Sequence, residues 1–328
     1  MKLRWMNRVR SRAGIRPGKW NGTVSPIRRA EAGKRQQQRR TQGMMTIDQI
    51  LTKLDHYYKE DQLTEVEPFL LSCLEDAKKE QEYGIYISVG NELLGFYRSI
   101  GQFEAAFAVG EDVLLLMEEL QLDHTVHFAT TLFNVATAYR TAGKYEEALA
   151  NYRRALEIYQ KELPKDDYRL AELYSSISIL LEKLNENENA ALFLGKAIQI
   201  MEKQPGTRVE VATSRTSLAL IELKMDKLEA AEKHLELAIS AFKEDGGKTD
   251  THYSAALAGL GEVCYRQGSL ERSLENYEHA LFEVEKHFGR KEGYGLLCGN
   301  CAAICRELGQ SAKAEEYEVQ RKKYCPEA

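Results

Sequence analysis

Residues 132–156 read LFNVATAYRTAGKYEEALANYRRAL. Apolar and small side chains recur at helical spacing on both sides of one glycine, Gly143. Glycine readily adopts the left-handed backbone conformation that ends a helix and lets the chain reverse. The stretch therefore predicts two amphipathic helices joined by a short turn.

The turn residue recurs along the chain at intervals of 40 to 42 residues. Each occurrence is Gly, Asn or Asp, the residue types that best tolerate the left-handed conformation. The seven turn residues are Asp61, Gly101, Gly143, Asn185, Asp226, Gly268 and Gly309. A fixed period of this length is typical of repeat proteins, in which each unit buries its apolar face against its neighbours. The sequence predicts about seven helix-turn-helix repeats.

A second column of the repeat, five residues after each turn residue, holds small side chains that would let two helices approach closely. Its members are Val66, Ala106, Ala148, Ala190, Ala231, Ser273 and Ala314. The apolar column twelve and thirteen residues after the turn is kept in six units and replaced by Arg321-Lys322 in the last. We therefore expect residues 312–324 to form a polar cap at that end of the repeats.

The best unit resembles the tetratricopeptide repeat family, in the variant of about 42 residues that occurs in kinesin light chains and many bacterial repeat proteins. It carries the family's Tyr139, Gly143, Tyr145, Ala148 and Tyr152 positions in order. The family's first-helix tryptophan is absent from the repeats, and its closing proline occurs only between some units. The resemblance implies an all-α fold, a right-handed superhelical α-solenoid over residues 45–328, whose first helices line a concave groove.

The resemblance also implies which side chains face that groove. On this alignment the candidate peptide-binding residues are Asn91, Arg98, Asn134, Thr137, Arg140, Glu182, Tyr265, Arg266, Asn300 and Arg306. Asparagine would hold the backbone of an extended or helical peptide, and arginine its carboxylates. A solenoid exposes polar residues on every outer face, so simple solvation of the surface remains the alternative for each of them.

Three cysteines, Cys298, Cys301 and Cys305, recur at helical spacing, and Cys264 occupies the matching place one repeat earlier. Three or four thiolates are able to bind zinc or an iron–sulfur cluster. The quoted repeat places Leu132, Val135 and Tyr139 at these positions, so we expect small core residues and neither metal nor cofactor. Neither HExxH nor GxSxG occurs, and we expect no enzyme activity.

The first 44 residues differ from the rest in charge, with 13 Lys and Arg against the single acid Glu31, although the whole chain has a net charge of −5. With little to bury, this basic arm is expected to be disordered and dispensable for folding. Three interpretations stay open: a start assigned upstream of Met44 and Met45, an arm that binds nucleic acid or the acidic repeats, and a transit peptide.

No stretch of the sequence is apolar enough to span a membrane, and no secretory signal is recognisable, so we expect a cytoplasmic protein. The expected function is a scaffold or adaptor that binds a protein or peptide in the groove. The alternative is a peptide-sensing regulator of the bacterial quorum type. Such regulators usually carry a helical domain before the repeats, whereas only the basic arm precedes Ile47 here. Nucleic acid is expected to bind only through that arm.

Overall fold

The computed structural model describes residues 44–244 and 251–326. The basic arm predicted over residues 1–44 therefore lies, except for Met44, outside the described residues. Within the described ranges the chain forms helices and no strand. The helices are α3 (Ile47–Lys59), α4 (Leu63–Lys79), α5 (Tyr83–Ser99), α6 (Phe103–Glu119), α7 (Val126–Thr141), α8 (Tyr145–Glu162), α9 (Tyr168–Lys183), α10 (Asn187–Met201), α11 (Arg208–Lys224), α12 (Leu228–Glu244), α13 (Thr251–Arg266), α14 (Leu270–Phe288), α15 (Glu292–Glu307) and α16 (Ser311–Tyr324).

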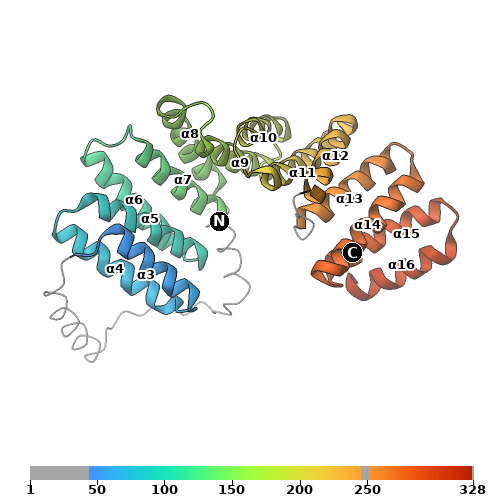
Figure 1. Ribbon diagram of the computed structural model, residues 1–328, viewed down its shortest axis with the longest axis horizontal. Helices are drawn as coiled ribbons and strands as arrows, with labels where there is room; N and C mark the ends of the chain where they lie inside the picture. Colours follow the sequence, from blue (N-terminus) through green and yellow to red (C-terminus); the bar gives the residue numbers. More distant parts are fainter. Residues whose placement is uncertain (1–43, 245–250, 327–328) are drawn as a thin grey trace. The chain divides into compact units, whose positions relative to one another are not determined.

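The helices pair into consecutive hairpins, each a first helix and a second helix (Figure 1). Two compact units divide the chain: an N-terminal unit, Met1–Glu162, and a C-terminal unit, Leu163–Ala328. In the described residues the N-terminal unit holds the hairpins from α3 to α8, and the C-terminal unit those from α9 to α16. The prediction of an all-α fold with seven helix-turn-helix repeats is confirmed.

The seven predicted turn residues all adopt the left-handed conformation, with φ between 55° and 81°. In the quoted repeat, the backbone N–H of Gly143 donates to the carbonyl of Arg140 at 3.2 Å, and that of Lys144 to the carbonyl of Tyr139 at 2.9 Å. This pair of bonds satisfies carbonyls that the end of α7 would otherwise leave open. Gln81 and Gln121, which no sequence signal indicated, have positive φ in turns between repeats.

Close packing of the two helices in a hairpin follows from the column of small residues. Every member of that column is buried, with at most 3% of its surface exposed. The hydroxyl of Ser178 on α9 donates to the carbonyl of Ala190 on α10 at 2.8 Å, and Ser273 on α14 reaches the carbonyl of Gly261 on α13 at 2.7 Å. Such bonds require backbones that nearly touch, as small side chains allow.

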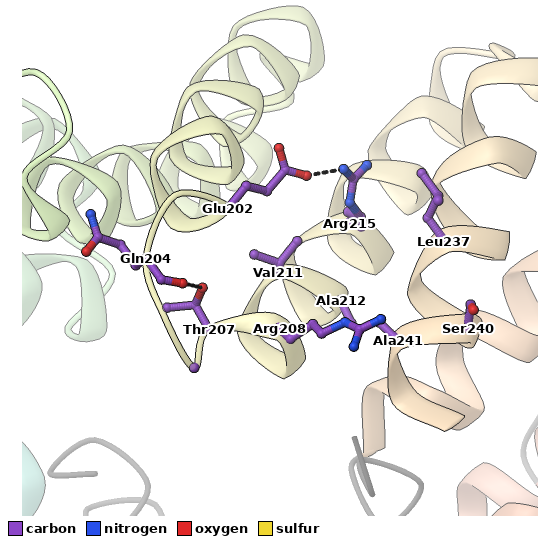
Figure 2. Close-up of a pocket in the computed structure, with 11 residues that line it drawn as sticks. Glu202, Gln204, Thr207, Arg208, Val211, Ala212, Arg215, Leu237, Ser240 and Ala241 are labelled. Atoms are coloured by element: carbon purple, nitrogen blue, oxygen red, sulfur yellow. Dashed lines mark hydrogen bonds and ion pairs between the residues drawn. The ribbon is translucent and has the colours of Figure 1, made fainter. Parts of the chain in front are cut away.

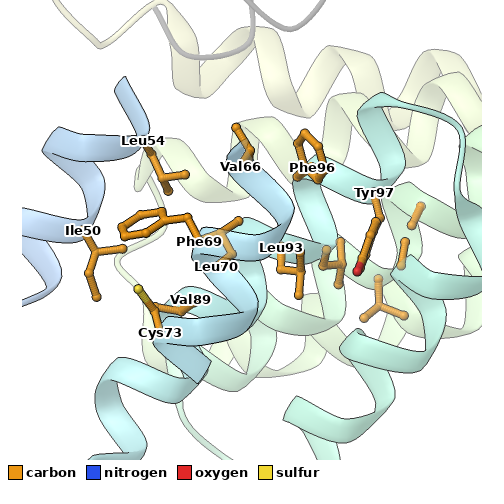
Figure 3. Packing of buried hydrophobic residues seen from close by; sticks show 14 of the residues in the cluster. Ile50, Leu54, Val66, Phe69, Leu70, Cys73, Val89, Leu93, Phe96 and Tyr97 are labelled. Carbon is orange, nitrogen blue, oxygen red and sulfur yellow. The ribbon is translucent and has the colours of Figure 1, made fainter. Parts of the chain in front are cut away.

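The core of the N-terminal unit lies between successive hairpins (Figure 3). Ile50 and Leu54 of α3 cover Phe69 and Leu70 of α4, and the cluster continues through Leu93 of α5. The start of α3 is fixed by a reciprocal cap, in which Thr46 and Gln49 each accept the other's backbone N–H. Apolar burial of this kind supplies most of the stability of tandem helices.

The core of the C-terminal unit includes the cysteines. Cys264, Cys298, Cys301 and Cys305 are all completely buried, and each packs in a hydrophobic cluster with neighbouring helices. Burial raises the pKa of Cys301, and the nearby carboxyl of Glu278 raises it further. These thiols are therefore held in their neutral form, which supports their interpretation as core residues.

Among the described residues, α16 buries a single side chain, Ala314, and most of its other residues are polar, with Tyr317 packed at the edge of the core and Val319 exposed. It ends the apolar stacking as the sequence led us to expect. No helix in the described part of the chain is long and apolar enough to cross a bilayer.

Candidate peptide-binding face

Five of the ten predicted groove residues lie on two adjacent first helices of the N-terminal unit. Asn91 and Arg98 are on α5, and Asn134, Thr137 and Arg140 are on α7, which packs against α5. We call this surface the N-terminal first-helix face. All five side chains are half-buried, so they are neither core residues nor freely solvated.

The two asparagines bind each other. The Asn134 amide donates to Asn91 Oδ1 at 2.7 Å, and the Asn91 amide donates to Thr131 Oγ1 at 3.0 Å and to the carbonyl of Ile87 at 2.9 Å. These bonds join α5 to α7 and fix the orientation of both amides. The asparagines thus also have a structural role between repeats, which the sequence prediction did not include.

The two arginines occupy the same position in adjacent repeats, three residues before the turn, and influence each other electrostatically. Burial lowers the pKa of Arg98, and the like charge of Arg140 lowers it further, whereas the Tyr152 hydroxyl acts in the opposite direction. Arg140 Nε donates to the Tyr152 hydroxyl at 3.3 Å. Because two nearby cations in a partly desolvated site repel each other, an anion placed against them is favoured.

Tyr152 is a site residue that the sequence analysis treated only as one of the family's repeat positions. It lies on the second helix α8, is fully buried, and shares a 3.0 Å hydrogen bond with Thr137 Oγ1. Tyr277 stands at the same position of a later repeat, and its hydroxyl donates to Glu262 at 3.1 Å, again on the first helix of its hairpin. Tyrosine recurs nine residues after the turn in these two repeats. This recurrence is the sequence signal that could have predicted the hydrogen bond from the second helix to a polar side chain of the first.

The predicted residues of the C-terminal unit mostly join neighbouring first helices. Glu182 accepts from Lys224 at 2.6 Å, and Tyr265 donates to Glu307 at 2.6 Å, each bond linking residues one repeat apart. Arg266 donates to the carbonyl of Leu223 at 2.9 Å. Glu182, Tyr265 and Arg266 therefore connect successive repeats.

The two remaining residues lie on α15. Asn300 is exposed, and Arg306 donates to Glu318 of α16 at 3.0 Å. Arg321 and then Arg306 lower the pKa of Glu318 to about 2 through hydrogen bonds. Arg306 therefore connects α15 to α16, the other helix of the same hairpin.

Tandem helical hairpins with left-handed turns, small residues at each crossing and polar first-helix surfaces define an α-helical repeat protein. The family model for the tetratricopeptide repeat matches residues 91–161, 127–203 and 210–281, more than half of the sequence. The chain belongs to the tetratricopeptide repeat family. Membership supports a protein-binding scaffold as its general role.

Relatives and solved structures agree with this assignment. Kinesin light chain-related 3 of Arabidopsis thaliana is 25% identical over 77% of this chain, but the chain spans only 39% of that relative's length. The crystal structure of BtubC (BKLC) from P. vanneervenii has a TM-score of 0.56 at 22% identity, covering 67% of this chain and 90% of the other. The apo form of RapI has a TM-score of 0.69 at 13% identity, covering 85% of this chain and 77% of RapI. At these identities the structural likenesses show the fold alone.

Proposed function

We propose that the chain is a protein-binding scaffold whose N-terminal first-helix face holds an acidic segment of a partner protein. Arg98 and Arg140 would bind the partner's carboxylates, with Thr137 beside them on α7. The amides of Asn91 and Asn134, already bonded to each other, would shape the wall along which the segment runs. The proposal extends to the exposed Asn300 as a contact in the C-terminal unit, and it assigns no catalytic role.

The observation that supports this proposal is the mutual position of the two arginines. Arg98 is half-buried and its pKa is lowered by burial and by the Arg140 charge. An acidic group would relieve that repulsion while making hydrogen bonds to guanidinium nitrogens. Hydrogen bonds to charged groups are worth about 1.5–3 kcal/mol each, so two of them would dominate the affinity for a short segment.

The proposal is tested by fluorescence anisotropy with a labelled peptide rich in Asp and Glu and a peptide of equal length in which these are Asn and Gln. The acidic peptide should bind more tightly, and the preference should decrease with added salt because the contact is ionic. Replacing Arg98 and Arg140 together by Ala should weaken binding of the acidic peptide by at least about tenfold. The circular dichroism spectrum and the melting temperature should change little.

Arg153 on the second helix α8 provides the matched control, since it is an exposed arginine of the same unit. Arg153→Ala should leave the affinity unchanged. Equal binding of the acidic and the neutral peptide would contradict the proposal. So would an affinity that survives the double substitution but is lost in Arg153→Ala, because that pattern would place the partner on the second helices.

A further inference from the structure

One hairpin, α11–α12 in the C-terminal unit, departs from the packing that the other hairpins share. Fifteen residues before the turn, the first helix of other repeats carries a large buried side chain that packs toward the second helix. These residues are Tyr86, Phe128, Leu170, Tyr253 and Tyr294. In α11 the corresponding residue is Val211. The hairpin therefore lacks the ring that fills this place in most of its siblings.

In three of these hairpins the second helix meets that large side chain with a residue eleven positions after the turn. Tyr86 donates to Asp112, and the guanidinium of Arg154 lies 5.6 Å from the centre of the Phe128 ring. Tyr253 and His279 pack edge to face, with 6.2 Å between ring centres. In α12 this position is Leu237, which remains 44% exposed. In these three sibling hairpins the residue at this position contacts an aromatic ring. The exposure of Leu237 therefore indicates that the corresponding space between α11 and α12 is not filled by a side chain.

A pocket of about 470 Å³ occupies this place (Figure 2). Val211 and Ala212 of α11 form one wall, and Leu237 and Ala241 of α12 face them. The connection between α10 and α11 closes a further side. Pockets that bind small ligands usually measure about 300–1,000 Å³ and combine apolar walls with a few polar groups.

The pocket also has polar side chains, and two of them are arginines. The polar lining residues are Glu202, Gln204, Thr207, Arg208, Arg215 and Ser240. Arg215 and Arg208 lie two turns apart on α11, and Figure 2 shows Val211 between them. Arg215 stands where other repeats place Leu132, Tyr174 or Leu257, all buried. A guanidinium cannot remain unpaired in an apolar core, and here it forms an ion pair with Glu202. Only 19% of the Arg215 side chain is exposed, so its charge is largely shielded from solvent.

Each of the two arginines is paired with a glutamate whose side chain is exposed to solvent. Arg208 pairs with Glu244, and more than half of both side chains is exposed. Glu202, the partner of Arg215, is 42% exposed. Because Glu202 and Glu244 are both open to solvent, a carboxylate brought by a ligand is able to replace either glutamate, whose own carboxylate is then hydrated. An aromatic ring that covers the apolar walls removes their surface from water, which favours binding.

We propose that the α11–α12 pocket is a second binding site, separate from the N-terminal first-helix face, and that its ligand is an aromatic carboxylate. The ring takes the place that tyrosine or phenylalanine fills in the sibling hairpins, between Val211 and Leu237. The carboxylate binds Arg215, with Arg208 at the outer edge. The same chemistry is offered by a free aromatic acid and by a peptide that ends in phenylalanine or tyrosine.

Titration of the full chain with N-acetyl-L-phenylalanine, observed at the methyl resonances of Val211 and Leu237, tests this site. We expect saturable shifts of both residues. N-acetyl-L-phenylalaninamide lacks the carboxylate and N-acetyl-L-alanine lacks the ring, and each should bind at least about tenfold more weakly. The tetrapeptide Gly-Gly-Gly-Phe distinguishes the sources: tighter binding than the acetylated amino acid indicates a chain terminus, and equal binding a free acid.

Two substitutions and a control complete the test. Val211→Tyr restores the sibling side chain and should abolish binding. Arg215→Leu restores the residue found at this position in α7 and α13, and should weaken binding of the acid to that of the amide. Arg272→Leu on α14 removes an arginine outside the pocket that also pairs with a glutamate, Glu232, although its side chain is 57% exposed against 19% for Arg215; it should have no effect. Unshifted Val211 and Leu237 methyl resonances, equal affinity for acid and amide, or full binding by Arg215→Leu would overturn the proposal.

Discussion

Residues at the same position of different repeats have different chemical roles in this protein. Three residues before the turn, the N-terminal unit carries Tyr58, Arg98 and Arg140, whereas the C-terminal unit carries Glu182, Leu223, Tyr265 and Arg306 at the corresponding places, so only the N-terminal unit has arginines in adjacent repeats. Arg98 and Arg140 repel each other, while Tyr265 is bonded to Glu307 of the next repeat. One backbone scaffold therefore places an anion-attracting surface in one unit and a structural bond in the other.

Cys301 tests the role of the cysteines at the residue scale. Its side chain is fully buried and burial raises its pKa, so both packing and low thiolate content predict an inert thiol. Cys301→Ala should lower the free energy of unfolding by about 1–2 kcal/mol through lost packing, as measured by urea denaturation. In the native state the thiol should react with Ellman's reagent only as fast as the structure opens. Stoichiometric zinc in protein purified without added metal would contradict this role.

Glu318 predicts a dependence of stability on pH. Hydrogen bonds from Arg321 and then Arg306 lower its pKa from 4.5 to about 2. A lowered folded-state pKa stabilises the protein above the unfolded value, and this contribution is lost as the pH falls through the folded value. The melting temperature of wild type should therefore exceed that of Glu318→Gln at pH 6, and the difference should shrink between about pH 4.5 and about pH 2.

The exposed Glu315 on the same helix supplies the control for this measurement. Glu315→Gln should melt like wild type across the same pH range. A difference between wild type and Glu318→Gln that stays constant down to pH 2 would show that the arginines do not hold this carboxyl in its charged form.

At the scale of the helix pair, glycine inside a helix is favourable only where another element approaches. A Cβ at Gly261 of α13 would lie 2.8 to 3.0 Å from ring atoms of Tyr277, whereas a Cβ at Gly195 of α10 would have no atom within 4 Å. The first glycine is required by the crossing of α13 and α14. The second has no packing reason and only lowers the helix propensity of α10.

These two glycines give a matched prediction for stability. Gly261→Ala should decrease the free energy of unfolding by about 1–3 kcal/mol, because the added methyl group collides with an aromatic ring in a tight crossing. Gly195→Ala should increase it by up to about 1 kcal/mol, because alanine favours the helix. Urea denaturation of both variants measures the difference. Equal effects would show that the α13–α14 crossing has room for a methyl group.

At the scale of the whole molecule, stability is distributed unevenly along the repeats. In the described residues α3 buries only Ile50 and Leu54, and α16 only Ala314, whereas α9 and α11 each bury eight residues and α13 buries nine. A repeat gains most of its stability from its neighbours, so a terminal helix with one neighbour opens more easily. Hydrogen–deuterium exchange should be fastest in α3 and α16 and slowest in α9, α11 and α13. Uniform exchange along the chain would indicate all-or-none unfolding instead.

The sequence by itself determined the repeat. The seven left-handed turns, the small residues at the helix crossings and the polar last helix are all local features, because backbone preference and helical periodicity depend on neighbouring residues in the chain. The position of Arg98 and Arg140 on one face follows from the same register. Fold class and repeat number were therefore predictable from residues such as Gly143 and Ala148 alone.

Only the tertiary structure decided which polar side chains bind each other. The bond between Asn91 and Asn134, the reach of Tyr152 to Thr137, and the pocket beside Val211 each depend on side chains from different helices meeting within a few ångströms. The repeat register shows on which face of a helix a residue lies. It does not show which rotamer the side chain adopts or which side chain of the neighbouring helix it contacts. For this reason Glu182 and Tyr265 were predicted as groove residues without their bonds to the next repeat, and the α11–α12 pocket was not predicted.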